Sequence, residues 1–119
     1  MIGFDTGFFV KFLEGNKDTL IIWEEIIRGK RGVVTCLTLF ELERLSLKGK
    51  LQPDVVLVLL ETIQEICEIV WLDNKNILSL GARLSYSLAI PAVDSLILAG
   101  FLNVRRQNHL YHGCRFNIV

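Results

Sequence analysis

Apolar and polar residues alternate along this chain in blocks that predict strands and helices in turn. Short blocks rich in β-branched and apolar residues favour buried strands, whereas longer blocks with apolar residues three and four apart favour helices. Gly, Asn and Pro between the blocks indicate where these elements end. The predicted strands are residues 1–6, 32–36 and 67–72, and residues 109–111 and 115–119 are predicted to form the last strand and a frayed end. The predicted helices are residues 8–14, 18–27, 38–48, 55–66, 76–88 and 92–102.

Most of the predicted strands are separated by one or two helices. Such connections favour parallel pairing with right-handed crossovers, because the chain returns to the same end of the sheet before each new strand. The sequence therefore predicts an α/β fold of three layers, with a central parallel sheet flanked by helices. The length of 119 residues fits a single domain over residues 1–119.

The composition indicates a folded protein with an unusually apolar surface. Hydrophobic residues make up 51% of the chain and the mean hydropathy is +0.43, which excludes disorder. The longest aliphatic run, residues 55–60, is bracketed by Asp54 and Glu61 and is far shorter than the roughly 20 residues of a membrane span. The helix predicted over residues 55–66 is apolar around most of its circumference, so we expect it to be covered on more than one side. We therefore expect self-association or a protein partner, and no membrane insertion.

Two further features favour the cytoplasm. The amino terminus shows neither the basic segment nor the small-residue cleavage site of a signal peptide. Cys36, Cys67 and Cys114 are odd in number and widely spaced, which suits reduced thiols better than a disulfide framework, and no zinc-binding spacing occurs.

The charges are balanced overall but unevenly distributed. Residues 28–50 contain six Lys or Arg and two acids, and residues 103–119 contain three Arg and no acid. Two basic zones of this kind can follow a phosphate backbone, although a solvated surface explains each of them equally well. The candidate phosphate contacts are Arg28, Lys30, Arg31, Arg44, Lys48, Arg105, Arg106 and Arg115.

Three acids each end an apolar run and begin a predicted helix. Each has a structural explanation: Asp5 as a helix cap, Glu41 as the second residue of a capping box with Thr38, and Asp94 as a partner of a helix dipole. Together, however, these helix starts fall along one edge of the predicted sheet. Carboxylates crowded there in apolar surroundings would repel one another unless a cation neutralised them. A hard divalent cation with oxygen ligands resolves that conflict.

The three acids belong to an ordered set of motifs that covers nearly the whole chain. The motifs are Asp5-Thr6-Gly7-Phe8-Phe9, Thr35-x-x-Thr38-x-x-Glu41, and Tyr86-Ser87-Leu88-x-Ile90-x-Ala92-x-Asp94-x-Leu96-Ile97-x-Ala99. This set resembles the PIN-domain family, and most closely its VapC-type toxins. The resemblance implies a metal-dependent endoribonuclease of a toxin–antitoxin system. It also implies an RNA substrate, a homodimer and an antitoxin whose carboxyl segment occupies the cleft.

Carried over to this sequence, the resemblance assigns Asp5, Glu41 and Asp94 to catalysis and to an Mg²⁺ or Mn²⁺ site, with Thr6 in support. We expect metal-activated water to attack the RNA phosphodiester in line, without a covalent intermediate. The basic zones would then hold the RNA backbone. His109 and His112 could touch metal or RNA, but ordinary surface or edge positions are the favoured interpretation.

The chain departs from the family pattern at its carboxyl end. The family usually supplies a further Asp just after the last core strand, but no acid follows Asp94 here, and Cys114 or Gly113 stands in its place. Asn117 or a water molecule could complete the coordination. An alternative is therefore a PIN-like module that binds RNA or an antitoxin without cleavage. A third possibility is a small α/β domain whose acids serve only as caps.

The aromatic residues could be imagined as platforms for stacking RNA bases. Their helical spacing favours core packing instead. The residues concerned are Phe8, Phe9, Phe12, Trp23 and Phe40.

Overall fold

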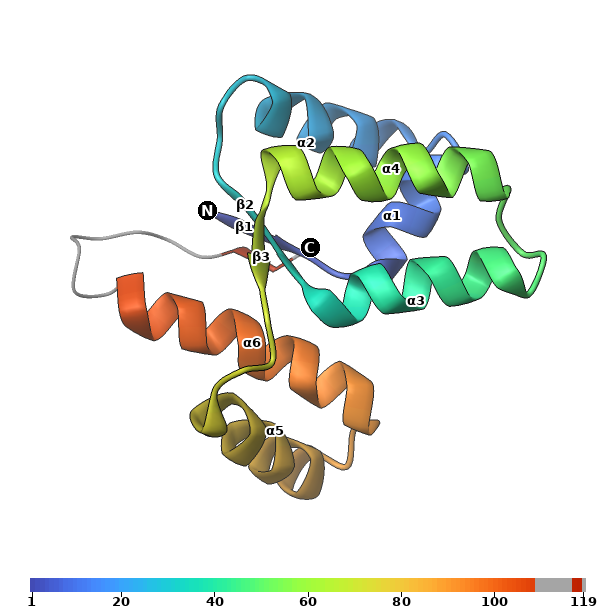
Figure 1. The fold of residues 1–119 in the computed structure, drawn as a ribbon. Coiled ribbons are helices and arrows are strands. Elements are labelled where there is room, and N and C mark those ends of the chain that lie inside the picture. Colours follow the sequence, from blue (N-terminus) through green and yellow to red (C-terminus); the bar gives the residue numbers. More distant parts are fainter. Residues whose placement is uncertain (109–116, 119) are drawn as a thin grey trace.

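The computed structural model describes residues 1–108 and 117–118 and confirms the predicted α/β fold (Figure 1). The described strands form one sheet in the order β3-β2-β1-β4, in which every pair is parallel. They are β1 (Ile2–Phe4), β2 (Gly32–Thr35), β3 (Glu68–Val70) and β4 (Asn117–Ile118). The helices are α1 (Thr6–Leu13), α2 (Lys17–Ile27), α3 (Cys36–Leu47), α4 (Pro53–Ile66), α5 (Lys75–Leu88) and α6 (Ala92–Asn108).

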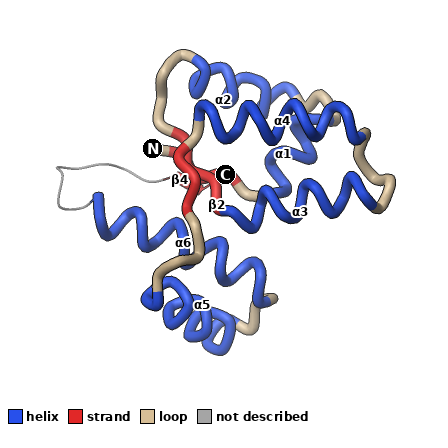
Figure 2. Tube along the Cα trace, in the orientation of Figure 1, coloured by secondary structure: helices blue, strands red, loops and turns tan. Residues whose placement is uncertain are grey.

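The helices cover the two faces of this short sheet, which gives the three predicted layers. Helices α1 to α4 lie on one face, and α5 and α6 lie on the other (Figures 1 and 2). The neighbouring residues Val33 and Val34 of β2 point to opposite faces, as expected for a strand, and each joins a different buried cluster. The sheet therefore contributes to two separate apolar cores.

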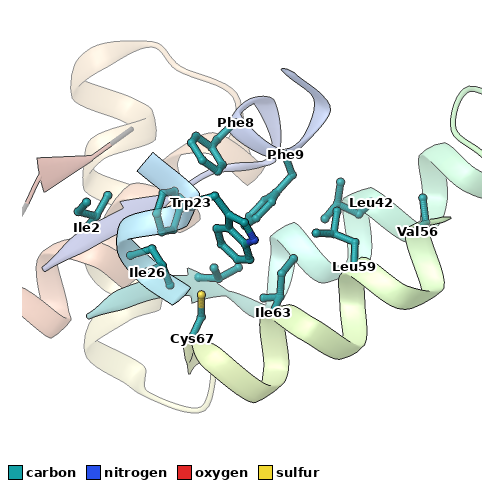
Figure 3. Close-up of a cluster of buried hydrophobic side chains, with 12 residues drawn as sticks. Ile2, Phe8, Phe9, Trp23, Ile26, Leu42, Val56, Leu59, Ile63 and Cys67 are labelled. Atoms are coloured by element: carbon teal, nitrogen blue, oxygen red, sulfur yellow. The ribbon is translucent and has the colours of Figure 1, made fainter. Parts of the chain in front are cut away.

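Aromatic rings fill the core beneath α1 and α2 (Figure 3). The rings of Phe4, Phe8, Phe9 and Trp23 contact one another with centroids 4.4–6.4 Å apart. Phe12 packs against Trp23 at 5.7 Å. Core packing is thus confirmed for the aromatic residues of α1 and α2.

The prediction of core packing was wrong for Phe40, which is 59% exposed. On α3 this residue lies two positions from each of Thr38 and Leu42, which are both fully buried. Two positions correspond to about 200° around a helix, so Phe40 faces away from the core. The aromatic side chain stands in solvent one residue before Glu41.

Helix α6 continues six residues beyond its predicted end at residue 102. The polar residues Asn103, Arg105 and Arg106 interrupt the apolar pattern there. Val104 is nevertheless buried in the same cluster as Ile97 and Phe101, at spacings of three and four residues. Tertiary packing on one face therefore extends this helix.

Among the described residues, helix α4 is covered on one side only. Val56, Leu59 and Ile63 are buried in the core, whereas Val55 and Val58 are exposed. The expected second cover is thus absent among residues 1–108 and 117–118. Within that part of the chain, no helix is both long and apolar enough to cross a bilayer.

The predicted last strand and frayed end fall partly outside the described residues. Only residues 117–118 of the segment 115–119 are described as a strand, and the segment 109–111 is not described. His109, His112, Gly113, Cys114 and Arg115 also lie outside the described residues.

Candidate functional site

Asp5 connects the end of β1 to the start of α1. Its backbone is extended, with φ −94° and ψ 178°, and its Oδ1 accepts a hydrogen bond of 2.9 Å from the backbone N–H of Phe8. This contact confirms that Asp5 caps α1. Capping uses lone pairs of one carboxylate oxygen, so a carboxylate in this role still has capacity for further ligands. Asp5 therefore combines a fixed position with free coordinating capacity.

Asp94 reaches the same place from the opposite layer of the fold. It lies in the first turn of α6 and is exposed, and it lines one pocket of about 160 Å³ together with Asp5. The remaining lining residues are apolar: Ile97, Leu98 and Phe101. The structure thus brings together two acids that are far apart in the sequence.

Glu41 is linked to the residue that follows Asp5. Its Oε1 accepts a hydrogen bond of 2.6 Å from the hydroxyl of Thr6, and Thr6 Oγ1 lies 3.4 Å from the hydroxyl of Thr38. Thr6 therefore supports Glu41 through a direct contact, whereas the sequence suggested support of its neighbour Asp5. This hydrogen bond ties the start of α1 to the second turn of α3.

The predicted capping box between Thr38 and Glu41 was wrong. Helix α3 begins two residues earlier, at Cys36, and its N-cap residue Thr35 makes no side-chain capping bond. Because α3 follows β2 without an intervening loop, Thr38 falls inside the first turn and is fully buried. Glu41 consequently contacts the neighbouring helix α1 instead of its own amino terminus.

The arrangement of carboxylates suits a metal site that is completed by water and substrate. In the part of the chain that is described, no three Asp, Glu, His or Cys side chains lie close enough together to hold a metal ion on their own. Mg²⁺ is, however, usually held by one or two carboxylates together with waters and substrate phosphates. The Asp5–Asp94 pocket offers two such oxygen donors, and Glu41 is bonded to Thr6, the residue that follows Asp5. The residues present therefore fit a hard divalent cation.

Asn117 enters the sheet away from this pocket. In the β1–β4 pair, Asn117 lies opposite Ile2 and Ile118 lies opposite Gly3. The backbone of Asn117 is thus level with a position three residues before Asp5, about 10 Å away along the strand direction. The structure does not bring the backbone of this candidate ligand beside Asp5.

Thr35 of β2 lies at the same end of the sheet as Asp5. Val34 pairs with Phe4, so Thr35, the last residue of β2, lies at the level of Asp5. Its hydroxyl is fully buried and has no hydrogen-bond partner within the described residues. A Cβ atom at Gly100 of α6 would lie 3.0 Å from Thr35 Cγ2, so this helix packs closely over Thr35.

Three of the candidate RNA contacts lie near the amino-terminal end of β2, opposite to the end of the sheet where Asp5 lies. Arg28, Lys30 and Arg31 precede β2, whereas the acids follow β1 or lie on α3 and α6. Each of these cations is paired with an acid: Arg28 with Glu24 at 3.9 Å, Lys30 with Glu25 at 3.2 Å, and Arg31 with Glu68. The structure does not bring them to the acidic pocket.

The other basic candidates lie at different distances from the acids. Arg44 is exposed on α3 and Lys48 is the exposed C-cap residue of this helix, about 4.5 and 10.5 Å beyond Glu41 along the helix axis. Arg105 and Arg106 are exposed near the end of α6, about 16 Å or more from Asp94 along that helix. Arg44 is thus the predicted cation nearest in sequence to a candidate acid.

One cation near Asp5 was missed by the sequence analysis. Lys11 on α1 lines a hollow of about 270 Å³ that Asp5 also lines. It is an isolated Lys in an apolar helix and belongs to neither basic zone. No local sequence pattern marks Lys11, because only the packing of α1 against α2 brings it to this hollow.

Comparison with known proteins gives one result at the level of the family. No curated protein matches the chain significantly. A family model described as PIN domain matches residues 2–100, a range that contains Asp5, Glu41 and Asp94. PIN domains are generally nucleases, and they generally use divalent metal ions. Because the match covers most of the 119 residues, the chain belongs to the PIN domain family.

Proposed function

We propose that this protein is a metal-dependent endoribonuclease and the toxin of a toxin–antitoxin pair that acts in the cytoplasm. The observation that carries the proposal is the shared pocket of Asp5 and Asp94. Membership of a family whose members are generally nucleases supports it. Glu41, held by Thr6 beside Asp5, supplies the third carboxylate.

In this proposal Asp5, Glu41 and Asp94 hold Mg²⁺ or Mn²⁺. When bound, such an ion supplies an acidified water as the nucleophile and neutralises charge that develops on the phosphate. The residues of the chain position the reacting groups. The capping bond to Phe8 N–H fixes Asp5, and the Thr6 hydroxyl orients the Glu41 carboxylate.

The apolar lining of the pocket also contributes to the proposed reaction. Ile97, Leu98 and Phe101 lower the local dielectric, which strengthens the attraction between the carboxylates and a cation. Arg44 and Lys48, exposed beyond Glu41, provide positive charge for the phosphates of the RNA backbone.

Conservative substitution of the acids tests the nuclease. We expect Asp5→Asn, Glu41→Gln and Asp94→Asn each to abolish cleavage of a single-stranded RNA in Mg²⁺ or Mn²⁺, with an unchanged circular dichroism spectrum. Glu65→Gln, at an exposed position of α4, serves as the matched control and should cleave normally. Undiminished cleavage by all three acid variants would overturn the proposal.

A binding module without cleavage is the second candidate. Two observations favour it: no acid follows Asp94 in the sequence, and the described residues contain no self-sufficient metal-binding group. Calorimetric titration of the wild-type protein with Mn²⁺ separates the two candidates. Binding together with RNA cleavage supports the nuclease, whereas no heat of binding at millimolar Mn²⁺ and no cleavage support the module.

The exposed apolar groove beside α4 fits an antitoxin helix. The groove lies between α1, α2 and α4 and encloses about 480 Å³. Its lining is almost entirely apolar: Phe12, Leu13, Trp23, Val55, Val58 and Leu59, with Asp54 and Thr62. An amphipathic helix laid in the groove would bury the side of α4 that this chain leaves exposed.

Co-purification with a co-expressed antitoxin that carries an amphipathic helix tests the antitoxin site. We expect Val58→Asp to abolish co-purification and to leave RNA cleavage by the isolated protein unchanged. Leu88→Asp, at an exposed position of α5, is the control and should leave co-purification intact. Equal retention of the partner by both variants would contradict the groove as its site. The homodimer is a separate prediction, which light scattering coupled to gel filtration would test.

A further inference from the structure

We propose that the hollow between α1 and α2 binds the nucleotide next to the cleaved phosphodiester, and that Lys11 contacts the phosphate of that nucleotide. The inference rests on the proposed nuclease function and adds a substrate-binding residue to it. Lys11 lies outside both basic zones, so nothing in the charge distribution points to it.

Asp5 lies between two concave sites, the pocket that it shares with Asp94 and the hollow beside α1. Asp5 lines the pocket of about 160 Å³ that it shares with Asp94, and it also lines the hollow of about 270 Å³ beside α1. A phosphate bound at Asp5 and Asp94 through the divalent cation of the proposed function would therefore have its neighbouring nucleotide at the second hollow. The substrate chain can pass from one hollow to the other across Asp5.

The position of Lys11 suits the adjacent phosphate. Lys11 lies six residues after Asp5, which corresponds to about 9 Å along the axis of α1. At this separation the ammonium group is not neutralised by Asp5, and no ion pair of Lys11 occurs within the described residues. This contrasts with Arg28, Lys30 and Arg31, whose charges are already matched by acids.

The other polar groups of the hollow match the remainder of a nucleotide. Asn16 Oδ1 accepts a hydrogen bond of 3.1 Å from Thr19 N–H, which leaves its amide N–H groups as donors. The Asp18 carboxylate is an acceptor suited to a ribose hydroxyl. The hollow thus presents a cation, a donor and an acceptor, a set that an inorganic anion alone would not use.

Gly7 keeps the entrance of the hollow open. A Cβ atom at this position would meet only Asp5 Oδ1, at 3.5 Å, and Gly7 itself is exposed. A long side chain there would project into the hollow that Gly7 lines. The position therefore offers a steric test that does not change any charge.

Binding of a short fluorescent single-stranded RNA, followed by anisotropy in an Asp94→Asn background with Mg²⁺, tests the inference. We expect Lys11→Gln to weaken binding on the order of tenfold, as for loss of a charge-assisted hydrogen bond. The slope of log affinity against log salt should fall in magnitude by about 0.7, the value for one phosphate contact on a single strand. Lys11→Arg should restore binding, and Gly7→Leu should weaken binding without changing the salt slope.

Lys17→Gln is the matched control, because Lys17 is also exposed but lies outside the hollow. The inference would be overturned if Lys11→Gln and Lys17→Gln weakened RNA binding equally, or if Lys11→Gln left RNA binding unchanged. If Lys11→Gln binds normally while Asp5→Asn abolishes cleavage, the subsite fails and the nuclease stands. If Asp5→Asn, Glu41→Gln and Asp94→Asn all cleave normally while Lys11→Gln alone loses affinity, the three-acid nuclease site fails and the hollow remains an RNA contact.

Discussion

The hydroxyl of Thr6 donates a hydrogen bond of 2.6 Å to Oε1 of Glu41, a residue 35 positions later in the chain. This contact joins the first residue of α1 to α3, and both side chains are half-buried. A hydrogen bond to a charged group in such a position contributes roughly 1.5–3 kcal/mol. It also sets the direction of one candidate metal ligand relative to Asp5.

Thr6→Val removes the donor and keeps the shape of the side chain. We expect cleavage of RNA and affinity for Mn²⁺ to fall by about 10- to 100-fold, the usual effect of losing a partner that orients a metal ligand. Single-turnover cleavage and calorimetry measure the two effects. Thr6→Ser should retain both, and Thr62→Val, which removes a hydroxyl bonded only to the backbone of α4, is the control. Normal Mn²⁺ affinity in Thr6→Val would show that Thr6 does not orient a ligand.

Two substitutions of Asp5 separate its capping role from its charge. Asn caps helices about as well as Asp, so Asp5→Asn should leave the free energy of unfolding nearly unchanged while it abolishes cleavage. Asp5→Ala loses the bond from Phe8 N–H and should cost about 1 kcal/mol in addition. Urea denaturation measures both variants. Equal stability of the Asn and Ala variants would contradict capping by Asp5.

The buried hydroxyl of Thr35 should reduce stability. Because it has no hydrogen-bond partner among the described residues, Thr35→Val should raise the free energy of unfolding by about 1 kcal/mol. Ser95→Ala is the contrasting variant, because the Ser95 hydroxyl is equally buried but donates a bond of 2.7 Å to the carbonyl of Ala92. It should lower stability by about 1 kcal/mol. Denaturation curves in which the free energy of unfolding changes in the same direction for both variants would refute this reasoning.

Burial raises the pKa of the Cys67 thiol to about 12, from an ordinary value of 9.0. The folded protein keeps this thiol neutral, whereas the unfolded chain ionises it near pH 9. The resulting contribution to stability is complete below pH 9 and is lost as the pH rises from about 9 to 12. The difference in free energy of unfolding between wild type and Cys67→Ala should therefore shrink above pH 9. Urea denaturation over this range checks the trend, and a constant difference would contradict it.

The order of elements and the parallel sheet could be predicted because both depend on local patterns. β-branched blocks such as residues 32–36 indicate strands, and apolar residues at helical spacing indicate helices. The placement of Asp5 as a cap follows from the same local logic, because the bond to Phe8 spans only three residues.

The errors arose where tertiary contacts outweigh the local pattern. The Thr38–Glu41 spacing fits a capping box, but Glu41 bonds to Thr6 of another helix. Phe40 is an aromatic residue of the kind that usually packs in a core, but the buried positions of its helix lie on the opposite side. Lys11 carries no local signal of a role, because only folding brings it to a hollow beside Asp5.

The pocket of Asp5 and Asp94 has walls from two different layers of the fold. Asp5 is fixed by the sheet and α1, whereas Asp94 depends on α6, which is attached to the sheet through the second buried cluster. Helices α5 and α6 pack tightly on each other, since a Cβ atom at Gly81 would come within 2.7 Å of Leu96. Because the pair has its own buried cluster against the sheet, we expect any local opening to move α5 and α6 together while the aromatic core stays folded. Partial opening of the molecule at that seam would silence the candidate nuclease without denaturing the rest.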